Sequence, residues 1–271
     1  MTTKPKNFPS DLPSKPLVEA IFEMRWALQA AGIGPGGPQI DPGFRFLLGR
    51  YQERIQESYP IARELPAASL PEDMTAYIVR HQFRAGQDAW PVTQLGPGIL
   101  SVNETSGYKW ERFESKVLEA ATAVLEAYPK TQGVPDLKLI SVMLRYQNAM
   151  NYSPQNESPR DYIRNKLHTN LEIDKELFSG PGQVQEPEQI TISSLFPLRD
   201  LPGEAQLQLS SGTKNNLPSI ILDIAVRTRG NSTPADVIGL KSWLELAHEI
   251  TESWFFTLCR GELRESFERN P

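Results

Sequence analysis

The sequence predicts a single α+β domain made of two similar halves, each with the element order β-α-β-β-β-α. Apolar residues make up 39% and charged residues 23% of the 271 positions, an ordinary globular mixture that can bury a core. Segments with a period of two and segments with a helical period occur in the same order twice. We expect a disordered or extended N-terminal segment over 1–14 and one domain over 15–271, with halves at about 15–130 and 135–260.

The first half begins with a strand over 17–28, in which Phe22, Met24 and Trp26 alternate with charged residues. A Gly- and Pro-rich loop over 30–43 follows, and it lacks the Gly-Lys-Ser/Thr ending of a phosphate-binding loop. Helical spacing predicts helices over 44–59 and 110–128. Period-two runs predict three strands between these helices, over 77–83, 90–95 and 99–103, with the last two joined in a hairpin.

The second half repeats this order. A strand over 137–150 has apolar residues on both faces, which predicts a central strand covered at least in part on each side. Ser158-Pro159 with Asp161 predicts the start of a helix. Three strands are expected over 189–196, 204–210 and 219–228. The pattern Thr233-Pro234 with Asp236 then precedes a long helix over about 235–258, which Gly261 kinks or ends.

These halves are expected to share one core. Each half makes a curved antiparallel sheet with its long closing helix packed across one face, and neither helix has a second apolar element of its own half to pack on. An approximate two-fold axis between the halves follows from this arrangement. The layout is analogous to that of saddle-like and helix-grip proteins, an analogy that concerns the fold alone.

Composition argues against several classes of function. A net charge of −5 argues against a nucleic acid as the main partner, because phosphate binding requires clustered Lys and Arg. Cys259 is the only cysteine, so neither a disulfide framework nor a cysteine zinc site is expected. No run approaches the roughly 20 apolar residues of a membrane span. The start of the chain is polar, without the apolar core of a signal peptide. We therefore expect a cytoplasmic protein that does not associate with a membrane.

The polar residues that stand out as ligand-binding candidates are two Arg-aromatic pairs and a nearby amide: Arg25 with Trp26, Arg145 with Tyr146, and Asn148. Under an approximate two-fold axis the two arginines occupy corresponding positions, where they could clamp a small anionic ligand or stack on bases. The alternative is that both are strand-end arginines paired with Glu19 or Glu23.

No catalytic, metal or cofactor site is predicted. None of the histidines has a second histidine or a carboxylate at metal-ligand spacing, and His248 with Glu245 and Glu252 is interpreted as a solvated charged edge. Tyr108 and Trp110 are interpreted as anchors of the second helix. The sequence contains no Gly-x-Ser-x-Gly motif. Glu19 and Glu23 share the side of Arg25, either as an acid-base site or, as the commoner outcome, in salt bridges.

Several segments resemble a sporadically distributed, uncharacterised family of prokaryotic proteins of about this length. The resembling text comprises residues 15–25, 94–98, 102–103, 107–111 and 144–148, together with the final helix that contains His248. The family implies no established activity or cofactor. Its patchy occurrence is similar to that of mobile or defence-associated genes.

Three functions remain open at this point. The first is a non-enzymatic module that binds a protein partner or itself through the sheet face or the long helices, as an accessory in a mobile or defence-associated system. The lack of a catalytic motif and the aromatic residues Trp243, Trp254 and Phe255 of the final helix favour it. The second is a protein that binds a small anionic ligand or nucleotide in a groove between the halves. The third is a carboxylate-based nuclease that uses Glu19 or Glu23.

Overall fold

The protein has an α+β fold centred on one large antiparallel sheet. A computed structural model describes residues 12–30, 37–178, 180–182, 187–228 and 232–269. Within these residues nine strands form an open sheet in the order β4-β5-β6-β7-β1-β8-β11-β10-β9. In that order their bounds are Ile61–Glu64, His81–Arg84, Val92–Gly96, Ile99–Glu104, Leu17–Trp26, Leu139–Asn151, Leu217–Arg227, Glu204–Lys214 and Thr191–Pro197. Two short strands, β2 (Gln29–Ala30) and β3 (Gln39–Ile40), pair separately.

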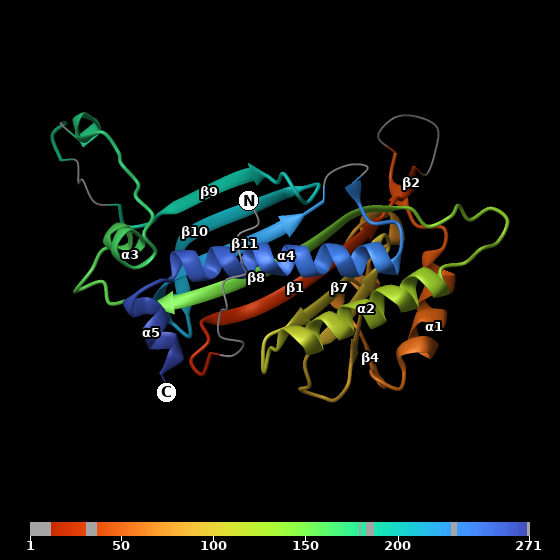
Figure 1. The fold of residues 1–271 in the computed structure, drawn as a ribbon. Helices are drawn as coiled ribbons and strands as arrows, with labels where there is room; N and C mark the ends of the chain where they lie inside the picture. Colours follow the sequence, from red (N-terminus) through yellow and green to blue (C-terminus); the bar gives the residue numbers. More distant parts are fainter. Residues whose placement is uncertain (1–11, 31–36, 179, 183–186, 229–231, 270–271) are drawn as a thin grey trace.

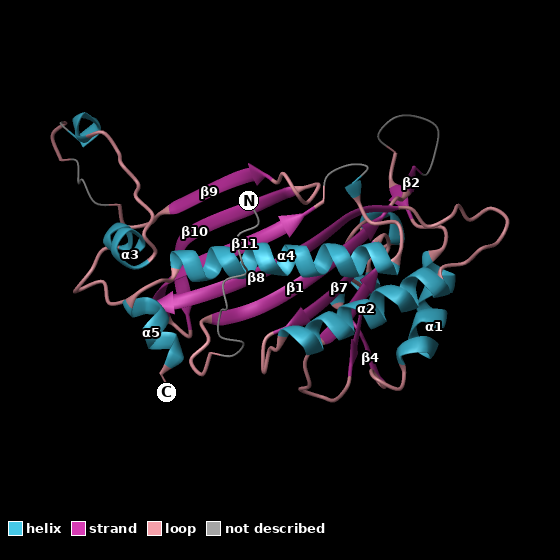
Figure 2. Cartoon of the chain, in the orientation of Figure 1, coloured by secondary structure: helices cyan, strands magenta, loops and turns pink. Residues whose placement is uncertain are grey.

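The helices described in the structure are α1 (Phe44–Ile55), α2 (Trp110–Ala127), α3 (Pro159–Lys166), α4 (Val237–Leu258) and α5 (Glu262–Glu268). Figures 1 and 2 show the long helices α2 and α4 side by side across one face of the sheet, with α1 next to α2. The sequence prediction of an antiparallel sheet with two long helices packed on it is confirmed at this level.

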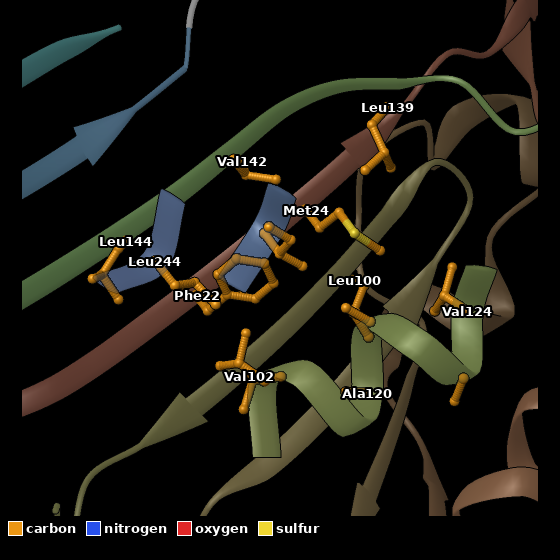
Figure 3. Close-up of a cluster of buried hydrophobic side chains, with 14 of the residues drawn as sticks. Phe22, Met24, Leu100, Val102, Ala120, Val124, Leu139, Val142, Leu144 and Leu244 are labelled. Carbon is orange, nitrogen blue, oxygen red and sulfur yellow. The ribbon is translucent and has the colours of Figure 1, made fainter. Parts of the chain in front are cut away.

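The core lies between this helical layer and the sheet. Alternate residues of β1, namely Ala20, Phe22, Met24 and Trp26, are fully buried, as their period of two predicts. Phe22 and Met24 lie beside Leu100 and Val102 of β7, Val142 and Leu144 of β8, Ala120 and Val124 of α2, and Leu244 of α4 (Figure 3). Burial of each large apolar side chain contributes roughly 1.5–3 kcal/mol. This cluster draws on both halves of the chain.

The opposite face of the sheet is partly exposed. On β1 this face carries Glu19, Ile21, Glu23 and Arg25, none of which is fully buried. β8 is central in the sheet, as predicted, but α2 and α4 cover only one of its faces. Along most of β8, buried residues on that face alternate with partly exposed residues on the other. Apolar residues on both faces of a strand therefore did not require a second helical layer.

Three local predictions need correction. The first half contains a strand that the sequence pattern did not reveal, β4, which has only four residues. The strand predicted over 77–83 begins at His81, because Tyr77 has a φ of 58° and cannot continue an extended strand. The helix predicted to reach Tyr59 ends at Ile55.

The predicted start of α3 is confirmed, since Ser158 Oγ accepts a hydrogen bond from Asp161 N at 3.1 Å. At α4 the capping residue is Asp236, whose Oδ1 accepts from Gly239 N at 2.8 Å. Thr233 instead donates its hydroxyl to the Ile140 carbonyl. Gly261 follows α4 with a φ of 74°, a value that glycine adopts without strain, and the chain turns there into α5.

The ends of the described chain lie together. Residues 1–11 of the predicted N-terminal segment lie outside the described residues, as do residues 31–36 of the Gly-rich loop. Leu12 is buried, and the Ser14 backbone N–H donates to the Phe267 carbonyl at 3.0 Å, just inside the end of α5. No helix within the described part of the chain is long and apolar enough to cross a membrane.

Candidate functional site

A cavity of about 130 Å³ lies where the start of α2 and the second half of α4 meet the sheet. We call it the α2–α4 cavity. Its apolar walls come from the N-terminal residues, β11 and both helices: Leu12, Pro16, Leu17, Trp110, Ile224, Phe255 and Phe256. Its polar lining comes from the same regions and from β8: Lys15, Tyr108, Lys109, Tyr146, Asn148, His248, Thr251 and Glu252.

Local structure explains why these side chains converge. On α4, His248, Thr251, Glu252 and Phe255 are spaced three and four residues apart, so they lie on one side of the helix. On β8, Tyr146 and Asn148 are two residues apart and share the face that meets the helices. The register between β1 and β8 shifts at the start of β1. Glu19 pairs with Gln147, and Leu17, two residues earlier, pairs with the very next residue of β8, Asn148. That shift adds Leu17 to the cavity wall.

A chain of hydrogen bonds joins three elements at this cavity. The hydroxyl groups of Tyr108 and Tyr146 lie 2.7 Å apart, and the Tyr146 hydroxyl lies 3.1 Å from Nδ1 of His248. Tyr108 precedes α2, Tyr146 is on β8 and His248 is on α4. Because each hydroxyl can donate or accept, the chain can run in either direction and can present either a donor or an acceptor to a bound molecule.

Burial keeps this chain electrically neutral. The Trp110 ring lies parallel to the His248 imidazole, with centroids 3.8 Å apart and an interplanar angle of 9°. Burial lowers the pKa of His248 to about 4, although the charge of Glu111 acts in the opposite direction. Burial also raises the pKa of the Tyr108 and Tyr146 phenols. At neutral pH the three groups therefore carry no charge.

The charges at the cavity belong to residues around this neutral chain. Lys15 donates from Nζ to the Tyr108 carbonyl at 2.8 Å, which ties the N-terminal residues to the start of α2. Burial raises the pKa of the Glu252 carboxyl, and the neighbouring charge of Glu249 adds to this effect. The charge of Glu252 in turn contributes to the raised pKa of both tyrosines, so its carboxylate and their hydroxyls lie within electrostatic range.

The structure separates the five residues that the sequence singles out. Tyr146 and Asn148 line the α2–α4 cavity. Trp26 lies elsewhere in the core, where its indole N–H donates to Asp41 at 2.7 Å. Arg25 and Arg145 project from the opposite face of the sheet, where Arg25 pairs with Ser141 and Arg145 with Ile21 in the strand register. The arginines therefore do not converge with the aromatic residues that follow them.

Asp41 explains the position of Trp26. This aspartate is only 2% exposed and accepts hydrogen bonds from the Trp26 indole, from the Tyr128 hydroxyl at 2.8 Å, and from two backbone N–H groups. A buried carboxylate is tolerated when donors surround it in this way. The group ties β1, the start of α1, the end of α2 and the turn at Gly98 together, which is a structural role.

On the opposite face, the arginines and glutamates already have partners. Arg145 donates from Nε and Nη2 to the Asp223 carboxylate, with Nε 2.8 Å from Oδ2. Arg25 Nε lies 2.7 Å from Glu23 Oε1, and the Arg25 guanidinium lies over the Tyr77 ring. Glu19 Oε1 accepts a hydrogen bond from Asn103 Nδ2 at 2.8 Å. Among the residues that the structure describes, no group of three or more His, Cys, Asp or Glu side chains could hold a metal ion.

Sequence reasoning did not assign Tyr108, Trp110, His248 or Glu252 to a binding site, although all of them line the cavity. One signal was present, since His248 and Glu252 are four residues apart and share a helix face with Phe255. Their convergence with Tyr146 depends on how α4 crosses β8, and the pattern of neighbouring residues in the sequence does not predict that crossing.

Neither a scan against protein-family models nor a search of curated proteins found a match to this chain. Membership of the uncharacterised prokaryotic family stays a prediction. The function must be inferred from the cavity itself.

Proposed function

We propose that this protein binds a small molecule in the α2–α4 cavity. The observation that carries the proposal is the combination of apolar walls with the hydrogen-bonded chain of Tyr108, Tyr146 and His248. Sites for small molecules are concave and mostly apolar, with a few polar groups that orient the ligand. Both predicted halves contribute to the cavity, in line with the hypothesis of a ligand bound between them.

The proposal differs from the sequence hypothesis in the chemistry of the ligand. The hypothesis of an anionic ligand rested on Arg25 and Arg145, and each of these has a carboxylate partner on the other face of the sheet. Of the aromatic residues that favoured a protein partner at the final helix, Trp243 is 4% exposed and so is not accessible to one, whereas Trp254 and Phe255 are partly exposed. The cavity supports ligand binding without those residues.

The test is ligand-dependent stabilisation of the wild type and of two matched variants. Leu17 and Ile21 are both partly exposed residues of β1, but only Leu17 lines the cavity. We expect at least one of benzylamine, benzyl alcohol and benzoate to raise the melting temperature, because a ligand at a hundredfold excess over its Kd adds about 2.7 kcal/mol of stability. Leu17→Trp fills the cavity and should abolish the rise, whereas Ile21→Trp should retain it. Stabilisation that survives Leu17→Trp would contradict the proposal.

A second function, self-association, is favoured by the edge strand β9. Among the described residues this strand pairs only with β10; it contains no charged residue, and Leu195 and Phe196 on it are 50% and 43% exposed. The opposite edge, β4, is shorter and carries Arg63 and Glu64. Natural proteins protect edge strands with charges or short length, so an unprotected edge is a site for further strand pairing.

A second copy of the chain fits this edge. If two β9 strands pair antiparallel about Ser194, Ile192 lies opposite Phe196 of the partner subunit, and Ser193 opposite the partner's Leu195. Apolar side chains would then meet on the face where Phe196 already packs against Trp254. This continues the hypothesis that the protein binds itself. A role in a mobile or defence-associated system stays a prediction.

We further infer that the two halves are structural repeats in a saddle-like or helix-grip arrangement. Outward from the central β1–β8 pair, the strands on the β1 side are β7, β6, β5 and β4, and those on the β8 side are β11, β10 and β9, so the two sides match except for β4. An axis through the paired residues Glu23 and Met143 would relate Arg25 to Arg145, each two positions further along its strand. The same axis would relate α2 to α4, which explains why a cavity between these helices draws on both halves.

A further inference from the structure

Glu252 is the acidic residue of the α2–α4 cavity lining. It is partly buried and lines the cavity together with Trp110 and Phe255. Within the described chain its carboxylate has neither a hydrogen-bond donor nor an ion-pair partner. A carboxylate that lies partly against apolar groups is incompletely solvated, so a cation or several donors would stabilise it.

The cations on the same cavity do not fill this role. Lys15 donates to the Tyr108 carbonyl, and Lys109 precedes the first turn of α2. Only Glu249, which is also acidic, perturbs the Glu252 carboxyl electrostatically. The neutral state of His248 adds no positive charge. The unmet electrostatic demand at Glu252 itself is therefore for a positive charge.

The aromatic residues of the lining also favour a positively charged ligand. Tyr108, Trp110, Tyr146 and Phe255 surround the cavity, and the face of an aromatic ring attracts a cation by roughly 0.5–2 kcal/mol. A carboxylate beside aromatic rings is a combination that recognises organic ammonium groups. The hydroxyls of the tyrosine pair can also accept hydrogen bonds from an ammonium group.

Resting on the proposed function, we propose that the α2–α4 cavity binds a small organic amine, whose ammonium group forms an ion pair with Glu252 and whose apolar body lies against the aromatic walls. The cavity volume of about 130 Å³ accommodates a body of about the size of a benzene ring, which occupies engineered cavities of about 150 Å³.

The test compares three probes of one shape and different charge by isothermal titration calorimetry at pH 7: benzylamine, benzyl alcohol and benzoate. We expect benzylamine to bind about tenfold more tightly than benzyl alcohol, and benzoate more weakly than either. Glu252→Gln should remove the advantage of benzylamine while leaving the affinity for benzyl alcohol unchanged. Glu249→Gln is the matched control, since Glu249 is exposed and lies outside the cavity lining, and it should retain the preference.

The outcomes distinguish this inference from the proposed function. If benzyl alcohol or benzoate binds as tightly as benzylamine, or if Glu252→Gln keeps the preference for benzylamine, the amine is wrong but the cavity remains a ligand site. If none of the three probes binds, both proposals are overturned. Melting temperatures of the variants without ligand show that each is folded.

Discussion

At the scale of single residues, the direction of a side chain decided which predictions survived. Successive residues of a strand point to opposite faces, so an arginine and the aromatic residue after it cannot face the same ligand. Arg25 and Trp26 illustrate this: one lies on the open face and the other is buried against Asp41. Arg145 and Tyr146 divide in the same way. The period of two in the sequence already contained this information.

His248 provides a prediction at this scale. Burial lowers its pKa from 6.5 to about 4, so the unfolded chain binds a proton more readily than the folded one. The contribution of the neutral imidazole is fully present above pH 6.5 and is lost as the pH falls through about 4. Between pH 7 and pH 4 we expect the free energy of unfolding to fall by up to about 3 kcal/mol more in the wild type than in the His248→Gln variant.

Urea unfolding of both proteins at several pH values measures this difference. The raised pKa of Glu252 acts in the opposite direction, since protonation of that carboxyl stabilises the fold. Both proteins contain Glu252, so its effect cancels in the comparison. Parallel pH profiles for the two proteins would show that the imidazole is not held neutral.

At the scale of elements, helices were predicted better than strands. Residues within a helix contact one another, and the start of α3 was correct because the Ser158 cap is local. A short strand such as β4 has no such signal, since its partner β5 begins 17 residues after β4 ends (64 to 81). The order of strands, and hence which strand lies at the edge, depends on pairings far apart in the chain.

The edge strand β9 carries the prediction at this scale. We expect the wild type to be a dimer in size-exclusion chromatography with light scattering, and Leu195→Lys to be a monomer, because a charge on the edge opposes strand pairing. Leu217→Lys is the control: Leu217 is 52% exposed, close to the 50% of Leu195, but lies at the hairpin between β10 and β11. A wild type that is monomeric at every concentration would exclude pairing through β9.

At the scale of the whole molecule, the sheet is continuous through the β1–β8 pair that joins the predicted halves. The larger buried cluster contains Phe22 and Val102 from the first half together with Leu144 and Leu244 from the second. A smaller cluster includes Leu222 at the other end of the second half. The boundary between the halves runs through the core. Unfolding one half alone would therefore expose apolar side chains of the other half to water, at a high cost in free energy.

We therefore expect one cooperative unfolding transition. Phe22→Ala and Leu222→Ala each leave a cavity, at a cost of about 3–5 and about 2–5 kcal/mol respectively, and both should shift the same transition. Tryptophan fluorescence and circular dichroism during urea unfolding should give the same midpoint for each variant. Two separate transitions, with each substitution shifting only one, would indicate two independent domains.

The sequence by itself determined the long helices and strands and the faces that they bury, because hydrophobic period and capping act between residues close together in the chain. It also indicated Tyr146 and Asn148. Only the tertiary structure decided the site. Tyr108, Tyr146 and His248 form one hydrogen-bonded chain although Tyr146 is 38 residues from Tyr108 and 102 from His248. Which face of α4 meets which strand depends on packing across the whole sheet, and local periodicity does not record it.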